Sequence, residues 1–182
     1  MASVEQRLAD LERRLAATED QLAIYQLLMA YGPAADSGSA DVVLALHHED
    51  ADYDSQVQSW HSGKAVADMI ASSDMHRDIM GNGSAHIATT PVVRIDGDKA
   101  YAVCHGQLLR FDKASDSFRI WRATAVALEF QRTEDGWKIY RRVNRLLDGS
   151  DTSHQHMRAG LRAAGAVPES PAEAAPKTAA TQ

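Results

Sequence analysis

The sequence predicts an α+β fold in which a curved sheet, mixed or antiparallel, wraps around helices to form a cone-shaped barrel. Three observations lead to this class. Four strand-length segments rich in β-branched and aromatic residues follow one another between Ser84 and Leu147. Short runs of turn residues separate them, as in an antiparallel meander. The preceding half of the chain carries helical spacing instead, so we expect the helices to gather on one face of the sheet.

The N-terminal segment, residues 2–31, predicts a long, extended helix. Its apolar stripe has a heptad-like spacing of alternately four and three residues, and its members are Val4, Leu8, Leu11, Leu15, Thr18, Leu22, Tyr25 and Met29. Two interpretations stay open. Either the stripe closes the helix onto its own domain, or its first half, Val4 to Leu15, projects and pairs with another subunit. We expect Gly32-Pro33 to end the helix.

Three short elements are predicted before the meander. Ser39 is a suitable cap for a helix over residues 40–48. Residues 51–55 form a brief strand that contains Tyr53, and residues 64–72 have helical spacing. The polar residues 73–83 are predicted to be a loop.

The meander is predicted to run over residues 84–94, 99–111, 118–131 and 137–147. A further helix is expected over residues 149–164. The Ala/Pro/Glu/Thr-rich residues 165–182 cannot form a core, and we expect a disordered tail there. The chain therefore divides into a helix extension (1–17), one α+β domain (18–148), the C-terminal helix and the tail.

Composition restricts the class of partner. A chain of 182 residues supports one core, and its net charge of −6 argues against a nucleic-acid surface, which needs clustered basic residues. A single cysteine, Cys104, excludes an intramolecular disulfide, and no signal pattern opens the sequence, so we expect a cytoplasmic protein. No apolar run reaches the roughly 18 residues that cross a bilayer, so we expect no membrane association.

The sequence offers an acid–base site made of ordinary side chains. It contains no metal-binding spacing, glycine-rich phosphate loop or GxSxG elbow, so we expect no metal and no other cofactor. If the turn pairs Arg94 with Lys99, His86 and His105 lie nearly opposite one another on one face of adjacent strands. Two such imidazoles are suited to proton transfer. The alternative is a structural role for each histidine.

An aspartate and two tyrosines complete the candidate set. A carboxylate in the apolar surroundings of Asp36 requires a partner, and it would orient a histidine and stabilise its charged form. The alternative is a capping aspartate in a turn. Tyr31 and Tyr53 either donate hydrogen bonds to a substrate oxygen or fill the core. Cys104 is predicted to face away from His105, which argues against a thiol nucleophile beside the histidine pair.

The last two strands supply candidate substrate contacts. Alternate residues share a face, which groups Arg122, Thr124 and Val126 on one strand and Tyr140, Arg142, Asn144 and Leu146 on the next. The sequence leaves open which face lines a cavity. From these strands we select Arg122, Thr124 and Asn144 as substrate-binding residues, together with Tyr53 and His105.

With these residues in place, residues 18–148 resemble a SnoaL-like member of the nuclear transport factor 2-like superfamily. The resemblance rests on the helix end LLMAYGPAADSGSADVVLALHHEDADYD, the strand and turn HIATTPVVRIDGDKAYA, and the ending TEDGWKIYRRVNRLLDG. The residues are similar to those of scytalone dehydratase and bile acid dehydratase, where a histidine and an aspartate assist elimination and tyrosine holds the substrate oxygen.

This resemblance implies a role for each residue. His86 matches the general acid–base, Asp36 the carboxylate that orients it, and Tyr31 the tyrosine that precedes the aspartate by five residues in the bile acid enzyme. Tyr53 and His105 resemble positions in the scytalone enzyme. That enzyme contacts its substrate through a serine and an asparagine where this chain offers Thr124 and Val126, which implies a different substrate.

The expected function is a cofactor-independent lyase of the dehydratase type that acts on a small, apolar, hydroxylated molecule, aromatic or polycyclic. Isomerases, polyketide cyclases and retro-aldol lyases of this superfamily use the same acid–base proton transfers, and the fold alone does not distinguish these reactions. The alternative from another class is a non-catalytic ligand-binding or assembly protein. An exposed sheet face with large side chains would favour a homo-oligomer, either dimer or trimer.

Overall fold

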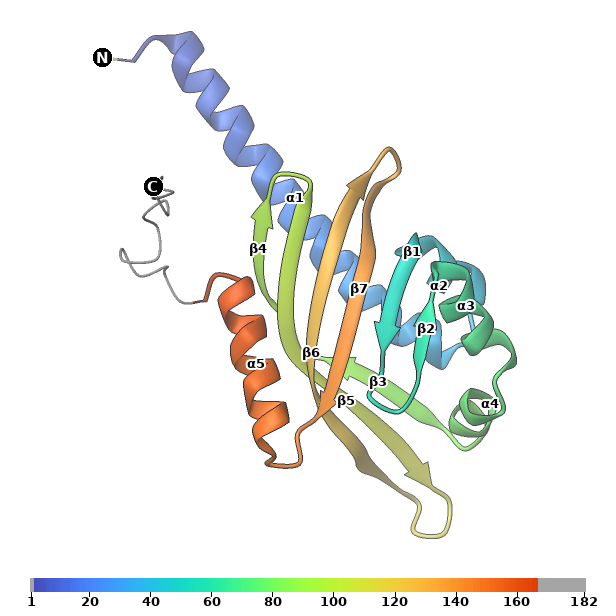
Figure 1. The fold of residues 1–182 in the computed structure, drawn as a ribbon. Coiled ribbons are helices and arrows are strands. Elements are labelled where there is room, and N and C mark those ends of the chain that lie inside the picture. Colours follow the sequence, from blue (N-terminus) through green and yellow to red (C-terminus); the bar gives the residue numbers. More distant parts are fainter. Residues whose placement is uncertain (1, 167–182) are drawn as a thin grey trace, which may run out of the picture.

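The computed structural model describes residues 2–166, which form five helices and a seven-stranded sheet (Figure 1). The elements are, in chain order, α1 (Val4–Asp36), α2 (Ala40–Leu46), β1 (His47–Asp54), β2 (Ser59–His61), α3 (Gly63–Ser72), α4 (Asp74–Gly81), β3 (Ser84–Ala88), β4 (Val92–Asp96), β5 (Lys99–Asp112), β6 (Ser117–Thr133), β7 (Gly136–Leu146) and α5 (Asp151–Ala163). The predicted α+β class, with its curved mixed sheet and long N-terminal helix, is confirmed.

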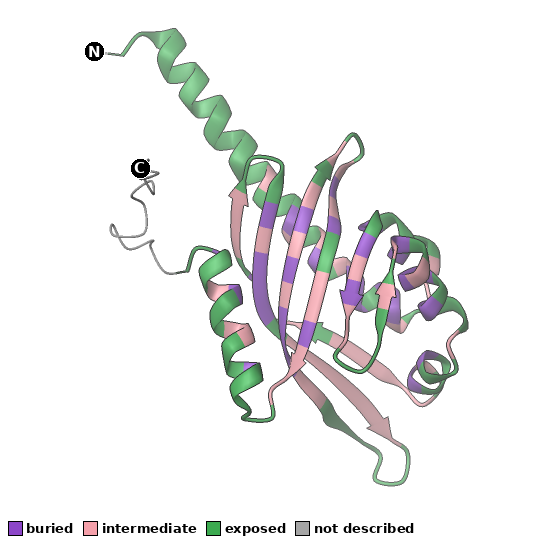
Figure 2. Ribbon diagram, viewed as in Figure 1, coloured by how far each residue is buried: buried purple, intermediate pink, exposed green. Residues whose placement is uncertain are grey.

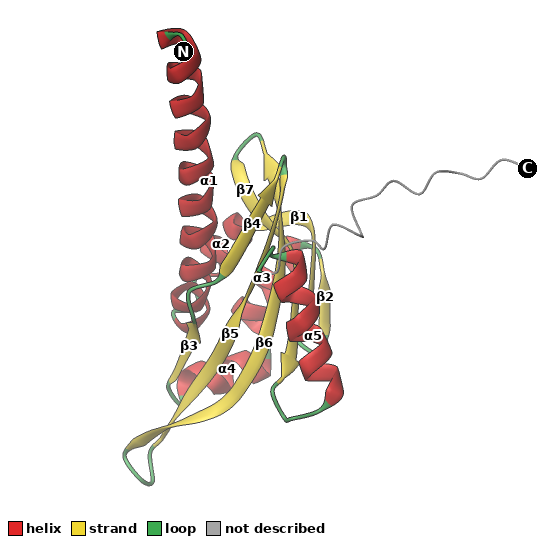
Figure 3. Cartoon of the chain, turned by 90° about the vertical axis from the view of Figure 1, so that its left-hand side faces the viewer, coloured by secondary structure: helices red, strands yellow, loops and turns green. Residues whose placement is uncertain are grey.

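The sheet is mixed, with strand order β2-β1-β7-β6-β5-β3 and β4 also paired to β5. Its long hairpins β5-β6 and β6-β7 are antiparallel, whereas β1 runs parallel to β7. Viewed along its edge, the sheet has α1 on one side and α5 on the other (Figure 3). The core lies between the sheet and the first three helices, where Ile24, Val43, Val66, Phe130 and Ile139 are almost completely buried.

Helix α1 continues through Gly32-Pro33 to Asp36, so the expectation that this dipeptide ends the helix is wrong. A proline inside a helix removes one backbone hydrogen bond and costs about 3 kcal/mol. Burial of Tyr31, Ala34 and Ala35 on both sides of Pro33 offsets that cost. As a consequence Asp36 belongs to the last turn of a helix instead of a loop.

Other boundaries differ from the predicted ones for local reasons. Residues 73–83 are not a loop, because Ser73 caps helix α4 by accepting a hydrogen bond from the backbone N–H of His76. Residues 84–94 form two strands, β3 and β4, with a break that contains Pro91, which has no N–H to donate to a ladder. The helix expected to reach His48 stops at Leu46, strand β1 starts four residues early, and strand β2 was not predicted.

The heptad stripe of α1 does not close the helix onto its own domain, so that interpretation is wrong. Six of its apolar members, from Val4 to Met29, have exposed fractions between 42% and 75%. The side chains that α1 buries against the domain belong to another face and include Ile24, Leu28 and Tyr31. Figure 2 shows the N-terminal half of the helix exposed and projecting beyond the sheet.

The predicted C-terminal helix corresponds to α5, and the proposed tail lies mostly outside the described residues. Helix α5 packs so closely on the sheet that a side chain at its Gly160 would collide with Val103. Within residues 2–166, no helix is long and apolar enough to span a membrane.

Gly32 lets the backbone of α1 touch that of β3. A Cβ atom at this position would overlap the carbonyl oxygen of His86. We expect Gly32→Ala to push the helix away from the strand and to lower the free energy of unfolding by about 1–3 kcal/mol, as overpacking does. Urea denaturation measures the change. Gly81→Ala is the matched control, because a Cβ there meets no atom within 4 Å. Equal stability of both variants would contradict the close approach.

Candidate active site

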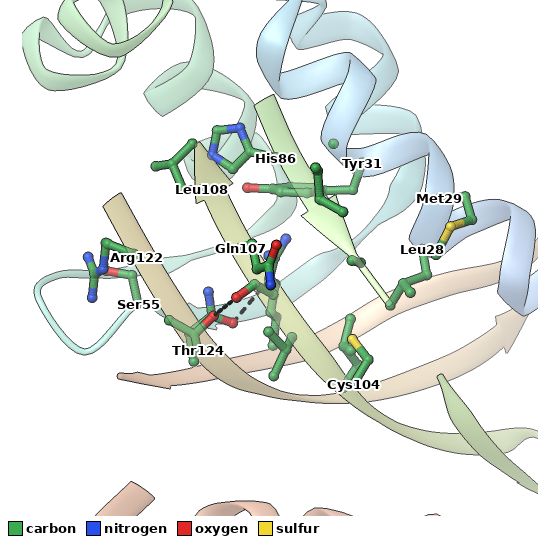
Figure 4. Close-up of a pocket in the computed structure, with 18 of the residues that line it drawn as sticks. Leu28, Met29, Tyr31, Ser55, His86, Cys104, Gln107, Leu108, Arg122 and Thr124 are labelled. Carbon is green, nitrogen blue, oxygen red and sulfur yellow. Dashed lines mark hydrogen bonds between the residues drawn. The ribbon is translucent and has the colours of Figure 1, made fainter. Parts of the chain in front are cut away.

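A cavity of about 310 Å³ opens between α1 and the concave face of the sheet (Figure 4). Strands β1, β3, β5, β6 and β7 and helix α1 all contribute to its lining. Much of the lining is apolar and includes Leu28, Cys104, Val126, Leu128 and Ile139. A site with these walls suits a small apolar molecule held by a few polar groups.

His86 and Asp36 form a hydrogen-bonded pair at the wall of this cavity. His86 Nδ1 lies 2.6 Å from Asp36 Oδ1, and the backbone N–H of His86 donates to Asp36 Oδ2 at 2.7 Å. The hydroxyl of Ser84 donates to Asp36 Oδ1 at 2.8 Å. Both side chains are largely buried, with exposed fractions of 23% and 21%. The contact predicted between the two residues is therefore present.

The surroundings of Asp36 keep it ionised. Burial opposes the charge, but the hydrogen bonds from His86 and Ser84 outweigh burial and hold the pKa of Asp36 below its usual value. A carboxylate can only accept, so His86 Nδ1 carries the proton of their hydrogen bond. This leaves Nε2 of His86 as the ring nitrogen available to a ligand, and His86 lines the cavity.

The two predicted tyrosines also line the cavity. Burial, together with the neighbouring phenol of Tyr53, raises the pKa of Tyr31, so Tyr31 stays a neutral donor. In Figure 4 the hydroxyl end of Tyr31 points toward the side of the cavity where His86 lies. Asn144 Nδ2 donates to the Tyr53 hydroxyl at 3.2 Å, which leaves the O–H of Tyr53 able to donate to a ligand.

The predicted substrate contacts divide into residues that reach the cavity and one that does not. Arg122, Thr124 and Asn144 line it, and Thr124 Oγ1 donates to the carbonyl of Gly106 at 3.3 Å. His105 is exposed and is not among the lining residues. In the observed register His86 pairs with Leu108 on β5, which lies three residues from His105 and points to the other side of the sheet.

Cys104 faces away from His105, as predicted, but the register puts it on the same face as His86, so the expected separation from His86 is wrong. The side chain of Cys104 lines the cavity. Burial raises the pKa of the Cys104 thiol to about 11, which makes it a poor nucleophile despite its position.

Two functional neighbours were missed. The second imidazole near His86 belongs to His76 of α4, at 6.3 Å between ring centroids. Burial lowers the pKa of His76, and its Nε2 lies 2.8 Å from the carbonyl of Ala35. The other is Arg142, whose guanidinium lies 4.0 Å from the ring centroid of Tyr31. Alternation with Asn144 along β7 was the signal for Arg142, whereas nothing in the sequence placed α4 beside His86.

Within residues 2–166, no group of three or more histidine, cysteine, aspartate or glutamate side chains is arranged to hold a metal ion.

Comparison with known families identifies a relationship over most of the chain. The family model described as the SnoaL-like domain matches residues 16–143. A comparison with curated proteins finds no match.

Solved structures show the same fold. A nuclear transport factor 2-like protein with a cystatin-like fold from Novosphingobium aromaticivorans is 35% identical, with a TM-score of 0.78 over 82% of this chain and 96% of that one. A second protein from that organism, assigned only provisionally as an aromatic ring hydroxylase, is 26% identical, with a TM-score of 0.56 over 71% of this chain and 90% of that one. A nuclear transport factor 2-like protein from Salmonella enterica is 10% identical and has a TM-score of 0.59 over 71% and 92% of the two chains, which supports the fold alone.

Proposed function

Because the chain belongs to the SnoaL-like domain family, whose superfamily includes dehydratases, isomerases and cyclases, we propose that it is a cofactor-independent lyase of the dehydratase type. The substrate is a small, mainly apolar molecule that carries a hydroxyl group and a carbonyl. The observation that carries the proposal is the Asp36–His86 pair at the cavity wall, which supports a ring nitrogen ready to accept a proton.

The reaction needs two proton transfers and no external reagent. His86 Nε2 removes a proton from the carbon beside the substrate carbonyl, and Asp36 stabilises the resulting imidazolium. Tyr31 or Tyr53 donates a hydrogen bond to the enolate oxygen. The imidazolium then returns its proton to the departing hydroxyl. The carbon–oxygen bond breaks as the enolate electrons form the new double bond, and water leaves.

The test is a screen of hydroxylated aromatic and polycyclic ketones for loss of one water, followed by mass spectrometry. We expect His86→Gln to lower the rate at which the enzyme dehydrates the compound found in the screen by about 10²–10⁴-fold, the usual contribution of a general acid–base. His105→Gln is the matched control, because it removes an exposed histidine from the next strand, and it should leave the rate unchanged. A rate that survives His86→Gln would reject the proposal.

The screen also separates the related chemistries. A product of unchanged mass would indicate an isomerase or cyclase that uses the same pair, and two smaller fragments would indicate a retro-aldol lyase. Binding without any product would favour a non-catalytic ligand-binding protein.

A further inference from the structure

The charged side chains that line the cavity are basic. Its lining includes Arg122, Arg142 and His86 but no aspartate or glutamate. The carboxylate that contacts the lining residue His86, that of Asp36, is already engaged by His86 and Ser84. A pocket with two guanidinium groups and no lining acid favours an anionic ligand.

Arg142 is held in a fixed position within this pocket. Its Nε donates to Asn144 Oδ1 at 3.3 Å, and its guanidinium carbon lies 4.0 Å and 5.0 Å from the ring centroids of Tyr31 and Tyr53. Nε is thereby satisfied, and two aromatic rings pack against the guanidinium. These contacts leave the Nη groups without a protein acceptor among the described residues, although a planar fork of donors matches a carboxylate.

The neighbouring arginines of β7 show the contrast. Arg145 pairs with Asp54 at 2.7 Å, and Arg141 lies within ion-pair distance of Asp52 and Glu129. Within residues 2–166, no carboxylate pairs with Arg142. Arg142 is half-buried. A partly desolvated cation without a counter-charge is costly, and a bound anion would reduce that cost.

We propose that the substrate is a carboxylate, and that Arg142 binds its carboxylate group while the apolar body fills the cavity. This deepens the proposed function, because the anchored end positions the reacting carbon against His86. Binding of the carboxylate needs only Arg142 and the apolar walls, whereas dehydration also needs His86. Carboxylate binding and dehydratase activity can therefore be tested separately.

The test compares matched ligands by isothermal titration calorimetry. The probes are benzoate, 2-naphthoate and the methyl ester of each acid. We expect at least one acid to bind the wild type about tenfold or more tightly than its ester, as a charge-assisted pair allows. Arg142→Met, which keeps much of the side-chain volume, should abolish this preference while still binding the ester, and Arg142→Lys should retain part of it.

Two controls make the result specific. Arg141→Met removes an adjacent arginine that lies outside the cavity lining, and it should keep the preference. His86→Gln should keep it too, even though turnover is lost, which separates failure of the catalytic proposal from failure of this one. Equal binding of acid and ester by the wild type, no binding of either acid, or a preference that survives Arg142→Met would overturn the proposal.

A second surface carries an independent inference, because the exposed stripe of α1 has flanking charges of opposite sign. In heptad notation Leu8, Leu15 and Leu22 occupy a positions, and Val4, Leu11 and Thr18 occupy d positions. Arg7 and Arg14 precede a positions, at g. Glu5, Glu12 and Glu19 follow d positions, at e.

This charge pattern selects the partner and its direction. In a parallel pair of helices a g residue faces the e residue five places further along the other chain. Arg7 would then face Glu12 of the partner subunit, and Arg14 would face Glu19 of the partner subunit. In an antiparallel pair g faces g and e faces e, so arginine would meet arginine and glutamate would meet glutamate. Ile24, Leu27 and Tyr31, which pack on the domain, lie on the other side of the helix.

We infer that residues 4–22 of two copies of this chain pair as a parallel coiled coil. The experiment uses Leu8→Cys and its neighbour Ala9→Cys in the full-length chain, since Cys104 is buried and does not compete. Under mild oxidation Leu8→Cys should form a covalent dimer, because an a position meets itself in a parallel register, and Ala9→Cys should not. A lack of selective cross-linking at position 8 would overturn the inference.

Charge reversal gives a second readout. Arg7→Glu with Arg14→Glu makes the seam acidic, and Glu12→Arg with Glu19→Arg makes it basic. For each variant alone, analytical ultracentrifugation should give a dimer dissociation constant that is higher by about tenfold or more. An equimolar mixture of the two variants should recover the wild-type affinity. Unchanged dissociation of both variants would also overturn the inference.

Discussion

Asp36→Asn is expected to lower kcat by about 10²–10⁴-fold with little change in KM, because the change acts on the tautomer of His86. The backbone N–H of His86 donates to Asp36 Oδ2 and cannot turn away. The amide oxygen of the asparagine must therefore take that place, and its NH₂ group then faces His86 Nδ1. An NH₂ group donates, so the ring has to carry its proton on Nε2, where it can no longer accept one from a substrate. Steady-state kinetics on the compound found by the screen measures the loss.

Ser84→Ala is the matched control for this effect. It removes one of the hydrogen bonds to Asp36 but leaves the carboxylate and its contact with His86. The expected loss of kcat is only a few-fold, in line with about 1 kcal/mol for one hydrogen bond. If Asp36→Asn were no slower than Ser84→Ala, the carboxylate would not direct the chemistry.

The second large effect concerns stability in acid and depends on His47. This residue starts β1 with its Nδ1 2.7 Å from the carbonyl of Val43, and within residues 2–166 its Nε2 is buried without a partner. Burial lowers the pKa of His47 to about 4 in spite of that hydrogen bond. The unfolded chain binds a proton below about pH 6.5, whereas the folded protein binds it only near pH 4. Stability is therefore complete above about pH 6.5 and is lost as the pH falls toward 4.

The size of the loss follows from the width of this window. At about 1.4 kcal/mol for each pH unit, His47 removes roughly 3 kcal/mol of folding free energy between neutral pH and pH 4. Urea unfolding across this range should show a shallower decline for His47→Gln than for the wild type. His105→Gln, which alters an exposed histidine, should decline as the wild type does. Parallel curves for all three proteins would show that His47 is not the titrating group.

The elements that the sequence predicted well are those with strong local signals. Alternation and turn residues located β5, β6 and β7 to within about two residues. The contact between Asp36 and His86 was also predictable, since a carboxylate in apolar surroundings needs a partner and the family resemblance supplied one. Its surroundings were not predictable, because His76 reaches the site from a helix whose segment reads as a polar loop.

The errors share a tertiary origin. The pairing of His86 with His105 assumed one continuous strand from 84 to 94 with Arg94 opposite Lys99. In the structure Arg94 pairs with Tyr101 and His86 with Leu108, so the break at Pro91 shifts the register by one residue and puts Cys104 instead of His105 on the face of His86. The end of α1 was misplaced, because burial around Pro33 outweighs its local preference. The heptad of α1 was recognised, but only the structure shows that Ile24, Leu28 and Tyr31, and not the stripe, meet the domain.

The central claim is that Asp36 fixes the proton of His86 on Nδ1 and leaves Nε2 free to take one from a substrate. ¹⁵N NMR of the histidine side chains, recorded at a pH where imidazoles are neutral, reads the tautomer directly. We expect the His86 resonances of the wild type to show a protonated Nδ1 and a bare Nε2, and Asp36→Asn to reverse this assignment. A wild-type His86 with its proton on Nε2, or one that Asp36→Asn does not change, would contradict the proposed acid–base pair.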